Sequence, residues 1–193
     1  MILRRATEKD APFIALAVME ALGDDIMERI QANNIGNEDR HSLDLITGVV
    51  RRTDTLYSWQ NTLVAEADNG ILLGAMVSYH GDNYLEMRDR TFSLLDELIT
   101  FDVSAMDAET VPGEYYLDSL AVAPSARGKG VGRKLLCAAR DEAFAMSLPA
   151  ILACAPDNIG AKKMYEAMGF RQDGEMFIFG HPYLRMVSEN KSY

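Results

Sequence analysis

The residues best placed to do chemistry lie between Arg127 and Gly132, where the sequence is Arg-Gly-Lys-Gly-Val-Gly. Glycines at alternate positions leave room for a bulky anion to approach the backbone, and the first amide groups and the dipole of a following helix would face that anion. Arg127, Lys129, Arg133 and Lys134 add positive charge to a chain that is otherwise short of it. The pattern predicts a phosphate-binding turn that suits a pyrophosphate.

The spacing of these glycines excludes two other phosphate loops. A P-loop has the pattern Gly-x-x-x-x-Gly-Lys-Ser/Thr, and a dinucleotide-binding turn has Gly-x-Gly-x-x-Gly after the first strand. Neither pattern occurs at this turn, so the sequence does not predict a kinase or a nucleoside triphosphatase. The simpler alternative is a glycine-rich turn with solvated basic residues. The strand before the turn and the amphipathic helix after it favour phosphate binding.

Two predicted elements position the turn. A strand at 115–122 precedes it and is ended by Pro124, and a helix at 131–146 follows it. The inner face of this helix is predicted to contain Val131, Leu135, Leu136, Ala139, Ala143 and Phe144.

The other predicted elements lie on either side of this unit. The strongest signal is a hairpin around Asp68-Asn69-Gly70, with strands at 62–66 and 71–79. The segment 23–58 is predicted to hold one or two helices without firm limits. Further elements are a strand at 2–5, a helix after Thr7, a strand at 150–154, a helix at 158–168 closed by Gly169, and last strands at 170–179 and 184–187.

An acidic insertion is predicted at 81–114, as a helix and a loop between two strands. Ten carboxylates fall between positions 82 and 118: Asp82, Glu86, Asp89, Asp96, Glu97, Asp102, Asp107, Glu109, Glu114 and Asp118. The insertion could cover a substrate cleft and attract a cationic amine. Alternatively, it is a solvated acidic face whose apolar stripe packs or dimerises. That stripe consists of Leu85, Phe92, Leu95, Leu98 and Ile99.

Composition limits the class of protein. The 193 residues suit one domain with a packed core, and a net charge of −10 argues against a nucleic-acid partner. The N-terminus has no secretory signal pattern and no 18-residue apolar stretch occurs, so we expect no membrane partner and a cytoplasmic location. Cys137 and Cys154 are expected to be buried thiols without a metal or a disulfide.

The turn also resembles a known family signature. Arg127 to Gly132 is similar to the Arg/Gln-x-x-Gly-x-Gly/Ala motif of the GNAT superfamily of N-acetyltransferases. Downstream, Asn158, Ala161, Tyr165-Glu166 and Gly169-Phe170 resemble the family's Asn-x-x-Ala-x-x-x-Tyr-Glu-x-x-Gly-Phe block. The resemblance covers about 115–170. It implies a single α/β (α+β) domain over 1–193, with a mixed, mostly antiparallel sheet whose fourth and fifth strands splay apart and are flanked by helices.

The resemblance implies a binding site for acetyl-CoA as a co-substrate, without a metal. The amides from Arg127 to Arg133 would hold the pyrophosphate, and the preceding strand would line the pantetheine arm. A backbone N–H near Val122 would polarise the thioester carbonyl. Asn158 would bond the pantetheine, cap its helix, or do both. The implied cofactor-binding residues are Leu120, Ala121, Val122, Arg127, Gly128, Lys129, Gly130, Val131, Gly132, Arg133 and Asn158.

Candidate catalytic residues are less specific. By the resemblance, Tyr165 faces the CoA sulfur and would protonate the departing thiolate, although it could simply pack on its helix. For the base we prefer Asp118 over Glu114, and a solvated or substrate-orienting Asp118 stays open. His80 is a weaker candidate. Some family members carry a carboxylate where this chain has Ala153, which favours a base that acts through water.

These expectations define two candidate functions. The first is an acetyl-CoA-dependent N-acetyltransferase that moves an acetyl group directly to a primary amine of a small molecule or peptide, with a cationic acceptor as one alternative. The second is a non-catalytic acyl-CoA-binding sensor or interaction domain of the same fold. A homodimer is one expectation for the oligomeric state.

Overall fold

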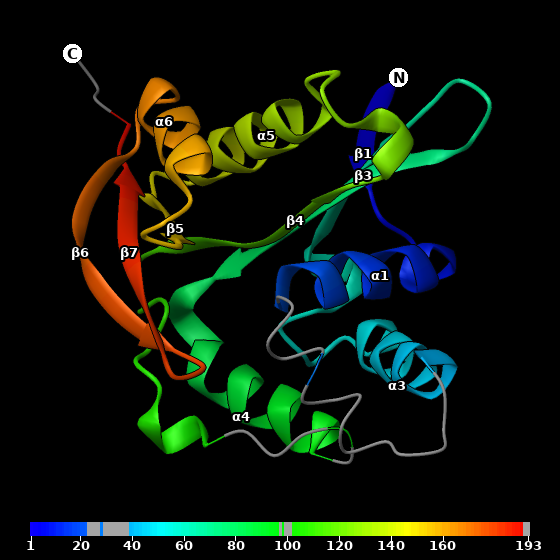
Figure 1. Cartoon of the computed structure of the whole chain (residues 1–193), viewed down its shortest axis with the longest axis horizontal. Coiled ribbons are helices and arrows are strands. Elements are labelled where there is room, and N and C mark those ends of the chain that lie inside the picture. The colour runs from blue at the N-terminus through cyan, green and yellow to red at the C-terminus, as the bar shows by residue number, and fades with distance from the viewer. Residues whose placement is uncertain (23–27, 29–38, 97, 99–101, 191–193) are drawn as a thin grey trace.

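A computed structural model describes residues 1–22, 28, 39–96, 98 and 102–190. Its strands form a seven-stranded sheet in the order β1-β2-β3-β4-β5-β7-β6 (Figure 1). All neighbouring strands are antiparallel except β4 and β5, which are parallel. The strands are β1 (Ile2–Arg5), β2 (Thr62–Glu66), β3 (Leu72–His80), β4 (Tyr115–Val122), β5 (Ala150–Cys154), β6 (Arg171–Ile178) and β7 (His181–Ser188).

The parallel pair β4–β5 separates soon after it begins. Its register contains two pairs, Tyr115 with Ala150 and Tyr116 with Ile151. Beyond them β4 continues to Val122 and β5 to Cys154 without pairing to one another. The predicted splay between the fourth and fifth strands is therefore confirmed, and it opens a gap in the middle of the sheet.

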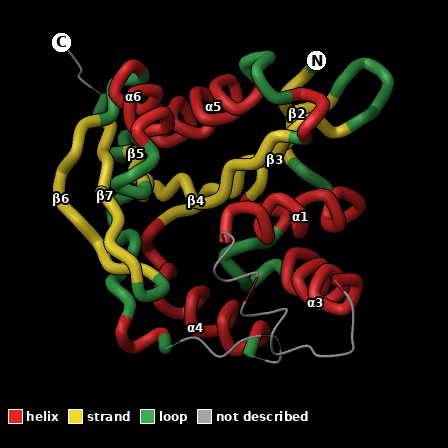
Figure 2. The backbone as a smooth tube through the Cα atoms, in the orientation of Figure 1, coloured by secondary structure: helices red, strands yellow, loops and turns green. Residues whose placement is uncertain are grey.

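Helices cover both faces of the sheet (Figure 2). On one side lie α1 (Ala11–Leu22), α3 (Asp39–Arg51) and α4 (Tyr84–Leu95), and on the other lie α5 (Val131–Ala145) and α6 (Ile159–Ala167). Buried side chains form one apolar cluster on each side. This mixed α/β arrangement confirms the predicted fold class.

Local sequence explains most element boundaries. Gly70 in the Asp68-Asn69-Gly70 turn has a φ of +82°, which glycine adopts at little cost, and the hairpin strands start and stop within one residue of the prediction. Gly169 ends α6 with a φ of +89°, as predicted for a left-handed cap. Within the predicted region 23–58, the structure describes α3, while residues 23–27 and 29–38 lie outside the described residues.

The acidic insertion lies between β3 and β4, and it contains α4 followed by a short 3-10 turn at Val103–Ala105. Phe92, Leu95 and Leu98 are buried as predicted. Leu85 was wrongly placed on the inner stripe, because 56% of it is exposed. Tyr84 faces inward instead, and Thr91, Phe92 and Leu95 lie on the same face of the helix. Glu97 and Ile99 lie outside the described residues.

Candidate active site

The glycine turn after β4 has the conformation that a phosphate cradle requires. Gly128 and Gly130 have φ values of +73° and +77°, where side chains are strained, and no other atom lies within 4 Å of a Cβ built on either residue. Both residues are exposed. The turn therefore presents bare backbone to solvent.

Amide groups at the start of α5 point out of this turn. The first α-helical bond runs from the N–H of Lys134 to the carbonyl of Gly130 at 3.1 Å. The N–H groups of Val131, Gly132 and Arg133 consequently precede the helical ladder and are available for an anion. A Cβ on Gly132 would lie 3.2 Å from Cγ2 of Val122, so the glycine lets the helix approach β4 closely.

Two of the basic side chains stabilise the turn by bonds to backbone carbonyl groups and to α1. Arg127 donates from Nε to the carbonyl of Val122 at 3.0 Å and pairs with Glu20 of α1 at 2.6 Å. Lys129 donates from Nζ to the carbonyl of Ser125 at 2.8 Å. Arg133 and Lys134 are exposed on the first turn of α5. The predicted positive charge is thus present, and part of it also holds the loop in shape.

The edge of β4 beyond its pairing with β5 faces the gap. The N–H of Ala123 donates to the carbonyl of Leu73 in β3 at 2.9 Å. Because backbone groups alternate in direction along a strand, the polar groups of Leu120 and Val122 point away from β3. The bond from Arg127 to the Val122 carbonyl agrees with this direction. A strand-like ligand arm could add to this edge.

A β-bulge interrupts the same strand in its middle. Met76 pairs with Leu120 and Ser78 with Leu117, so Asp118 and Ser119 together lie opposite Val77. A bulge of this kind leaves one residue unpaired and redirects its side chain. The bulge places Asp118 and Ser119 at the wall of a cavity.

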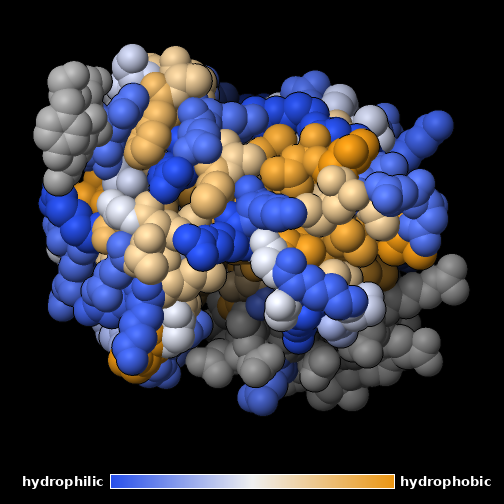
Figure 3. Space-filling view, turned by 90° about the horizontal axis from the view of Figure 1, so that it is seen from above, coloured by the Kyte–Doolittle hydropathy of each residue, from blue (hydrophilic) through white to orange (hydrophobic). Residues whose placement is uncertain are grey.

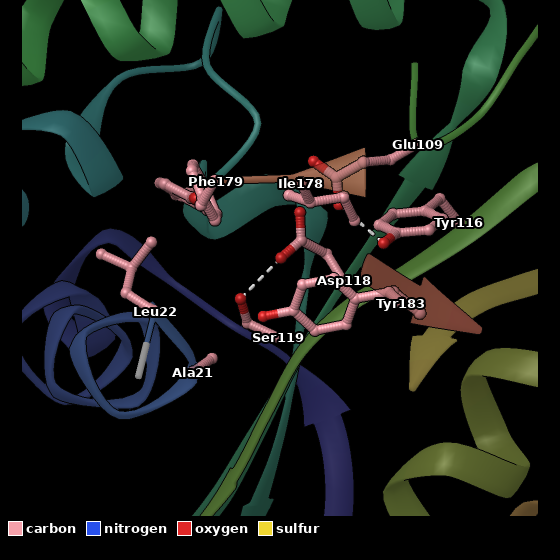
Figure 4. Close-up of a pocket in the computed structure, with 11 residues that line it drawn as sticks. Ala21, Leu22, Glu109, Tyr116, Asp118, Ser119, Ile178, Phe179 and Tyr183 are labelled. Carbon is pink, nitrogen blue, oxygen red and sulfur yellow. Dashed lines mark hydrogen bonds between the residues drawn. The ribbon is translucent and has the colours of Figure 1, made fainter. Parts of the chain in front are cut away.

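That cavity has a volume of about 110 Å³ and lies between the end of α1, β4, β5 and the β6–β7 turn (Figure 4). Ser119 and Ala153 line it, and both lie beyond the last β4–β5 pair, so the cavity adjoins the gap in the sheet. Its lining consists of Ala21, Leu22, Tyr57, Glu109, Tyr116, Asp118, Ser119, Ala153, Ile178, Phe179 and Tyr183.

Asp118 is held in this wall by two hydroxyl groups. Tyr79 donates to Oδ2 at 2.5 Å, and Ser119 donates to Oδ1 at 2.6 Å. The residue is partly accessible from the cavity, yet protein surrounds its carboxyl group, and this desolvation raises the pKa of Asp118. The two hydrogen bonds act in the opposite direction.

Glu109 is a second carboxyl group in the cavity, and sequence reasoning missed it as a site residue. It is 8% exposed and accepts hydrogen bonds from Tyr84 at 3.1 Å and from Tyr116 at 2.6 Å. Burial raises the pKa of Glu109 to about 7, with a further contribution from the negative charge of Asp118. No local pattern distinguishes Glu109 from its acidic neighbours in the sequence, because only the fold brings it beside Asp118.

Tyr165 and Asn158 lie in or beside α6. Tyr165 packs edge-on against Phe170, with ring centroids 6.1 Å apart, and burial raises its pKa to about 12. It belongs to the apolar cluster on the α5–α6 side, whereas Tyr116 beside Asp118 belongs to the cluster on the α1–α4 side. Asn158 caps α6 by accepting from the N–H of Ala161 at 3.0 Å.

Two other candidates from the sequence are not in the cavity. Glu114 was considered as a base, but its carboxylate pairs with Arg185 and also accepts from Thr110, away from the cavity lining. His80 is exposed and stacks edge-on against Tyr115 at 5.4 Å. Cys154 is buried, and burial raises the pKa of its thiol, which opposes a nucleophilic role.

Within the described residues, no group of three or more His, Cys, Asp or Glu side chains is arranged to hold a metal ion. In the same part of the chain, no helix combines the length and apolar character needed to cross a membrane.

Solved structures share this architecture along nearly the whole chain. A crystal structure described as an acetyltransferase is 28% identical, with a TM-score of 0.75 and coverage of 98% of this chain and 99% of that one. An N-acetyltransferase from Staphylococcus aureus Mu50 is 23% identical, with a TM-score of 0.74 and coverage of 97% and 100%. A structure from Corynebacterium glutamicum, described as histone acetyltransferase HPA2 and related acetyltransferase, is 22% identical, with a TM-score of 0.67 and coverage of 99% and 97%.

The sequence itself was also compared with curated proteins and with family models. No curated protein matches it significantly. The model of the acetyltransferase (GNAT) family matches residues 38–170, a range that includes the glycine turn, both cavity carboxyl groups and α6. The chain therefore belongs to the GNAT acetyltransferase family.

Proposed function

We propose that this protein is an N-acetyltransferase that uses acetyl-CoA as donor and a primary amine of a small molecule or peptide as acceptor. The observation that carries the proposal is the pair of features at the β4–β5 gap. Bare amide groups at the start of α5 provide a diphosphate site, and a cavity with two carboxyl groups adjoins the gap. Family membership supports acyl transfer, and these features support the choice of donor and acceptor.

The turn fits the diphosphate of coenzyme A by three criteria. Gly128 and Gly130 have open space where a side chain would stand, the first N–H groups of α5 precede the helical ladder, and Arg133 and Lys134 add exposed positive charge. Leu120 and Val122 then present backbone groups toward the gap, where a pantetheine arm could follow the strand. In this proposal Asn158 mainly caps α6.

The chemistry proceeds by direct attack. The amine nitrogen forms a bond to the thioester carbonyl carbon, the carbon–sulfur bond breaks, and coenzyme A leaves as a thiolate. Asp118, directly or through a water, receives the proton that the amine loses, and Tyr165 supplies a proton to the thiolate. A backbone N–H at the β4 bulge or near Val122 stabilises the developing oxyanion.

The test is a turnover assay with acetyl-CoA and a panel of primary amines, in which the release of free coenzyme A is followed. We expect turnover with at least one aliphatic amine, and we expect Asp118→Asn to lower kcat by about 100-fold or more while the affinity for coenzyme A stays the same. Tight coenzyme A binding without turnover on any amine would instead identify a non-catalytic acyl-CoA sensor. Absence of both binding and turnover would remove the proposal.

The organisation of the chain forms part of the proposal. We take residues 1–193 as a single acetyltransferase domain, with 81–114 as an acidic insertion on the acceptor side of the gap. Limited proteolysis tests this organisation, because a single domain should lose its coenzyme A binding and its folded core in one step.

A further inference from the structure

The acidic insertion ends in a segment that is held near both of its ends by hydrogen bonds and, at one end, by an ion pair. We call residues 107–114 the strap. At one end, Asp107 donates its N–H to the carbonyl of Phe177 at 2.9 Å and accepts from the N–H of Phe177 at 2.7 Å. At the other end, Gly113 donates to Asp82 at 3.1 Å and Glu114 pairs with Arg185 of β7. Glu109 lies between these anchors, so its position is fixed by the fold of the strap.

The cavity that Glu109 enters has the chemistry of a cation site. Glu109 and Asp118 both line it, and none of its described lining residues is Lys, Arg or His. The guanidinium of Arg88 lowers the pKa of Glu109 by its charge, but it lies over the ring of Tyr84 at 5.7 Å and is not part of the lining. A cationic ligand would therefore meet two acidic groups and no positive side chain from the described residues.

Tyr57 gives a second and independent indication of a ligand. The residue is 4% exposed and lines the cavity. Its hydroxyl group bonds to no other described residue, whereas the hydroxyls of Tyr79, Tyr84 and Tyr116 each bond to a carboxyl group. No fully buried side-chain N or O atom of the described residues lacks a partner, so the Tyr57 hydroxyl is accessible from the cavity, where a molecule that enters can bond to it.

The size and the apolar walls of the cavity limit that molecule. A volume of about 110 Å³ is that of about four water molecules in the liquid, which suits a short methylene chain with an amino group. Leu22, Ile178 and Phe179 provide apolar contacts for such a chain. A carboxylate on the ligand would lie against Glu109 and Asp118 and be repelled.

From this juxtaposition we infer that Glu109 is a specificity-determining residue, which selects a short, unbranched aliphatic amine with cationic character and rejects amines that carry a carboxylate. The inference rests on the proposed function, and it specifies the acceptor for that same site. Asp118 contacts the reacting amine, while Glu109 adds the negative charge and Tyr57 a hydrogen bond.

The test compares three amines with four carbon atoms each by titration calorimetry with coenzyme A present: 1,4-diaminobutane, butylamine and 4-aminobutyrate. Wild-type protein should bind the diamine at least tenfold more tightly than 4-aminobutyrate, with butylamine between them. Glu109→Gln keeps the shape of the side chain and removes its charge, so it should reduce that preference by about tenfold. Tyr57→Phe should weaken diamine binding severalfold and leave the melting temperature unchanged.

Glu86→Gln is the matched control. It makes the same substitution in the same insertion, but its side chain is 75% exposed and pairs with Arg90 outside the cavity. This variant should retain the wild-type preference. The inference is overturned if wild-type protein shows no preference for the diamine, or if Glu109→Gln and Glu86→Gln have equal effects. Because binding is measured, diamine binding without coenzyme A release would sink the proposed function and leave this inference standing.

Discussion

At the scale of single residues, the two carboxyl groups of the cavity differ in how the fold holds them. Asp118 comes from a β-bulge and contacts Tyr79 and its own neighbour Ser119. Glu109 comes from the strap and is enclosed by Tyr84 and Tyr116. Both have a raised pKa because burial disfavours the charged form. Groups of this kind are more often found at functional sites than in inert parts of a core.

Ionisation of Glu109 should lower the stability of the folded protein as pH rises. Its usual pKa is 4.5 and its folded pKa is about 7, so the folded state holds the proton more tightly between these values. Stability is greatest below the unfolded pKa and is lost as pH rises toward 7. Glu109→Gln cannot ionise, so above pH 7 it should exceed the wild type by on the order of 1–3 kcal/mol.

The measurement is urea unfolding of both proteins in acidic and in mildly alkaline buffer. The two should converge below the unfolded pKa, where Glu109 is protonated in either state. Glu86→Gln again serves as the control, because its exposed side chain should leave the pH dependence unchanged. If Glu109→Gln is more stable than the wild type above neutral pH but binds amines poorly, Glu109 costs stability and serves function.

Tyr165 gives a second prediction at this scale. Tyr165→Phe removes the hydroxyl group and keeps the ring that packs against Phe170. If the hydroxyl protonates the thiolate, kcat should fall by about 100-fold while the dissociation constant for coenzyme A is unchanged. A kcat equal to that of the wild type would show that the ring only packs.

At the scale of elements, the strand–turn–helix unit from β4 to α5 carries the proposed donor site. Gly130→Glu should abolish coenzyme A binding, because it places a side chain and a negative charge where the diphosphate approaches. Gly70→Glu is a close control: its φ of +82° matches the +77° of Gly130, and both have open space at the Cβ position. Calorimetry should show binding lost in the first variant and retained in the second.

The strap is the second element with a testable role. Asp107→Ala removes the carboxylate that accepts from the N–H of Phe177, which should loosen one anchor at a cost of about 1 kcal/mol. We expect a severalfold rise in KM for the amine with no change in coenzyme A affinity, since the anchors of the strap described above lie at Phe177, Arg185 and Asp82 and not in the glycine turn. Equal losses in both affinities would show that the strap supports the whole fold.

At the scale of the whole molecule, net charge should influence the encounter with substrate. The chain has a formal net charge of −10, while basic residues gather at the glycine turn. Attraction of a dication should weaken with salt, because the screening length falls from about 30 Å at 0.01 M to about 10 Å at 0.1 M. The kcat/KM for 1,4-diaminobutane should therefore fall over this range, and that for butylamine should fall less. Equal slopes would contradict steering.

The face of the molecule seen when the view of Figure 1 is turned to look from above carries both hydrophobic and hydrophilic surface. Figure 3 shows hydrophobic residues gathered across the middle of this face, with hydrophilic residues around them. Coenzyme A combines a charged diphosphate with a less polar arm, so a binding face for it needs both kinds of surface. The acidic insertion occupies the other side of the sheet, which separates the proposed acceptor site from the donor site.

The sequence by itself determined the features that depend on neighbouring residues. Gly70, Gly128, Gly130 and Gly169 have the positive φ angles that their turns require, and Asn158 caps its helix. The strand at 115–122 has the predicted bounds. These features arise from backbone sterics and local hydrogen bonds, which a short stretch of sequence specifies.

Tertiary structure alone decided which of the many carboxylates face the cavity. Glu114 was a candidate base, but its carboxylate accepts a hydrogen bond from Arg185, which lies 71 residues away in the chain. Glu109 was one acid among ten, yet it lies beside Asp118 because the strap is anchored to β6 by a contact across 70 residues. Burial and charge depend on which distant segments meet, and the pKa of a side chain follows from that meeting rather than from its neighbours in the chain.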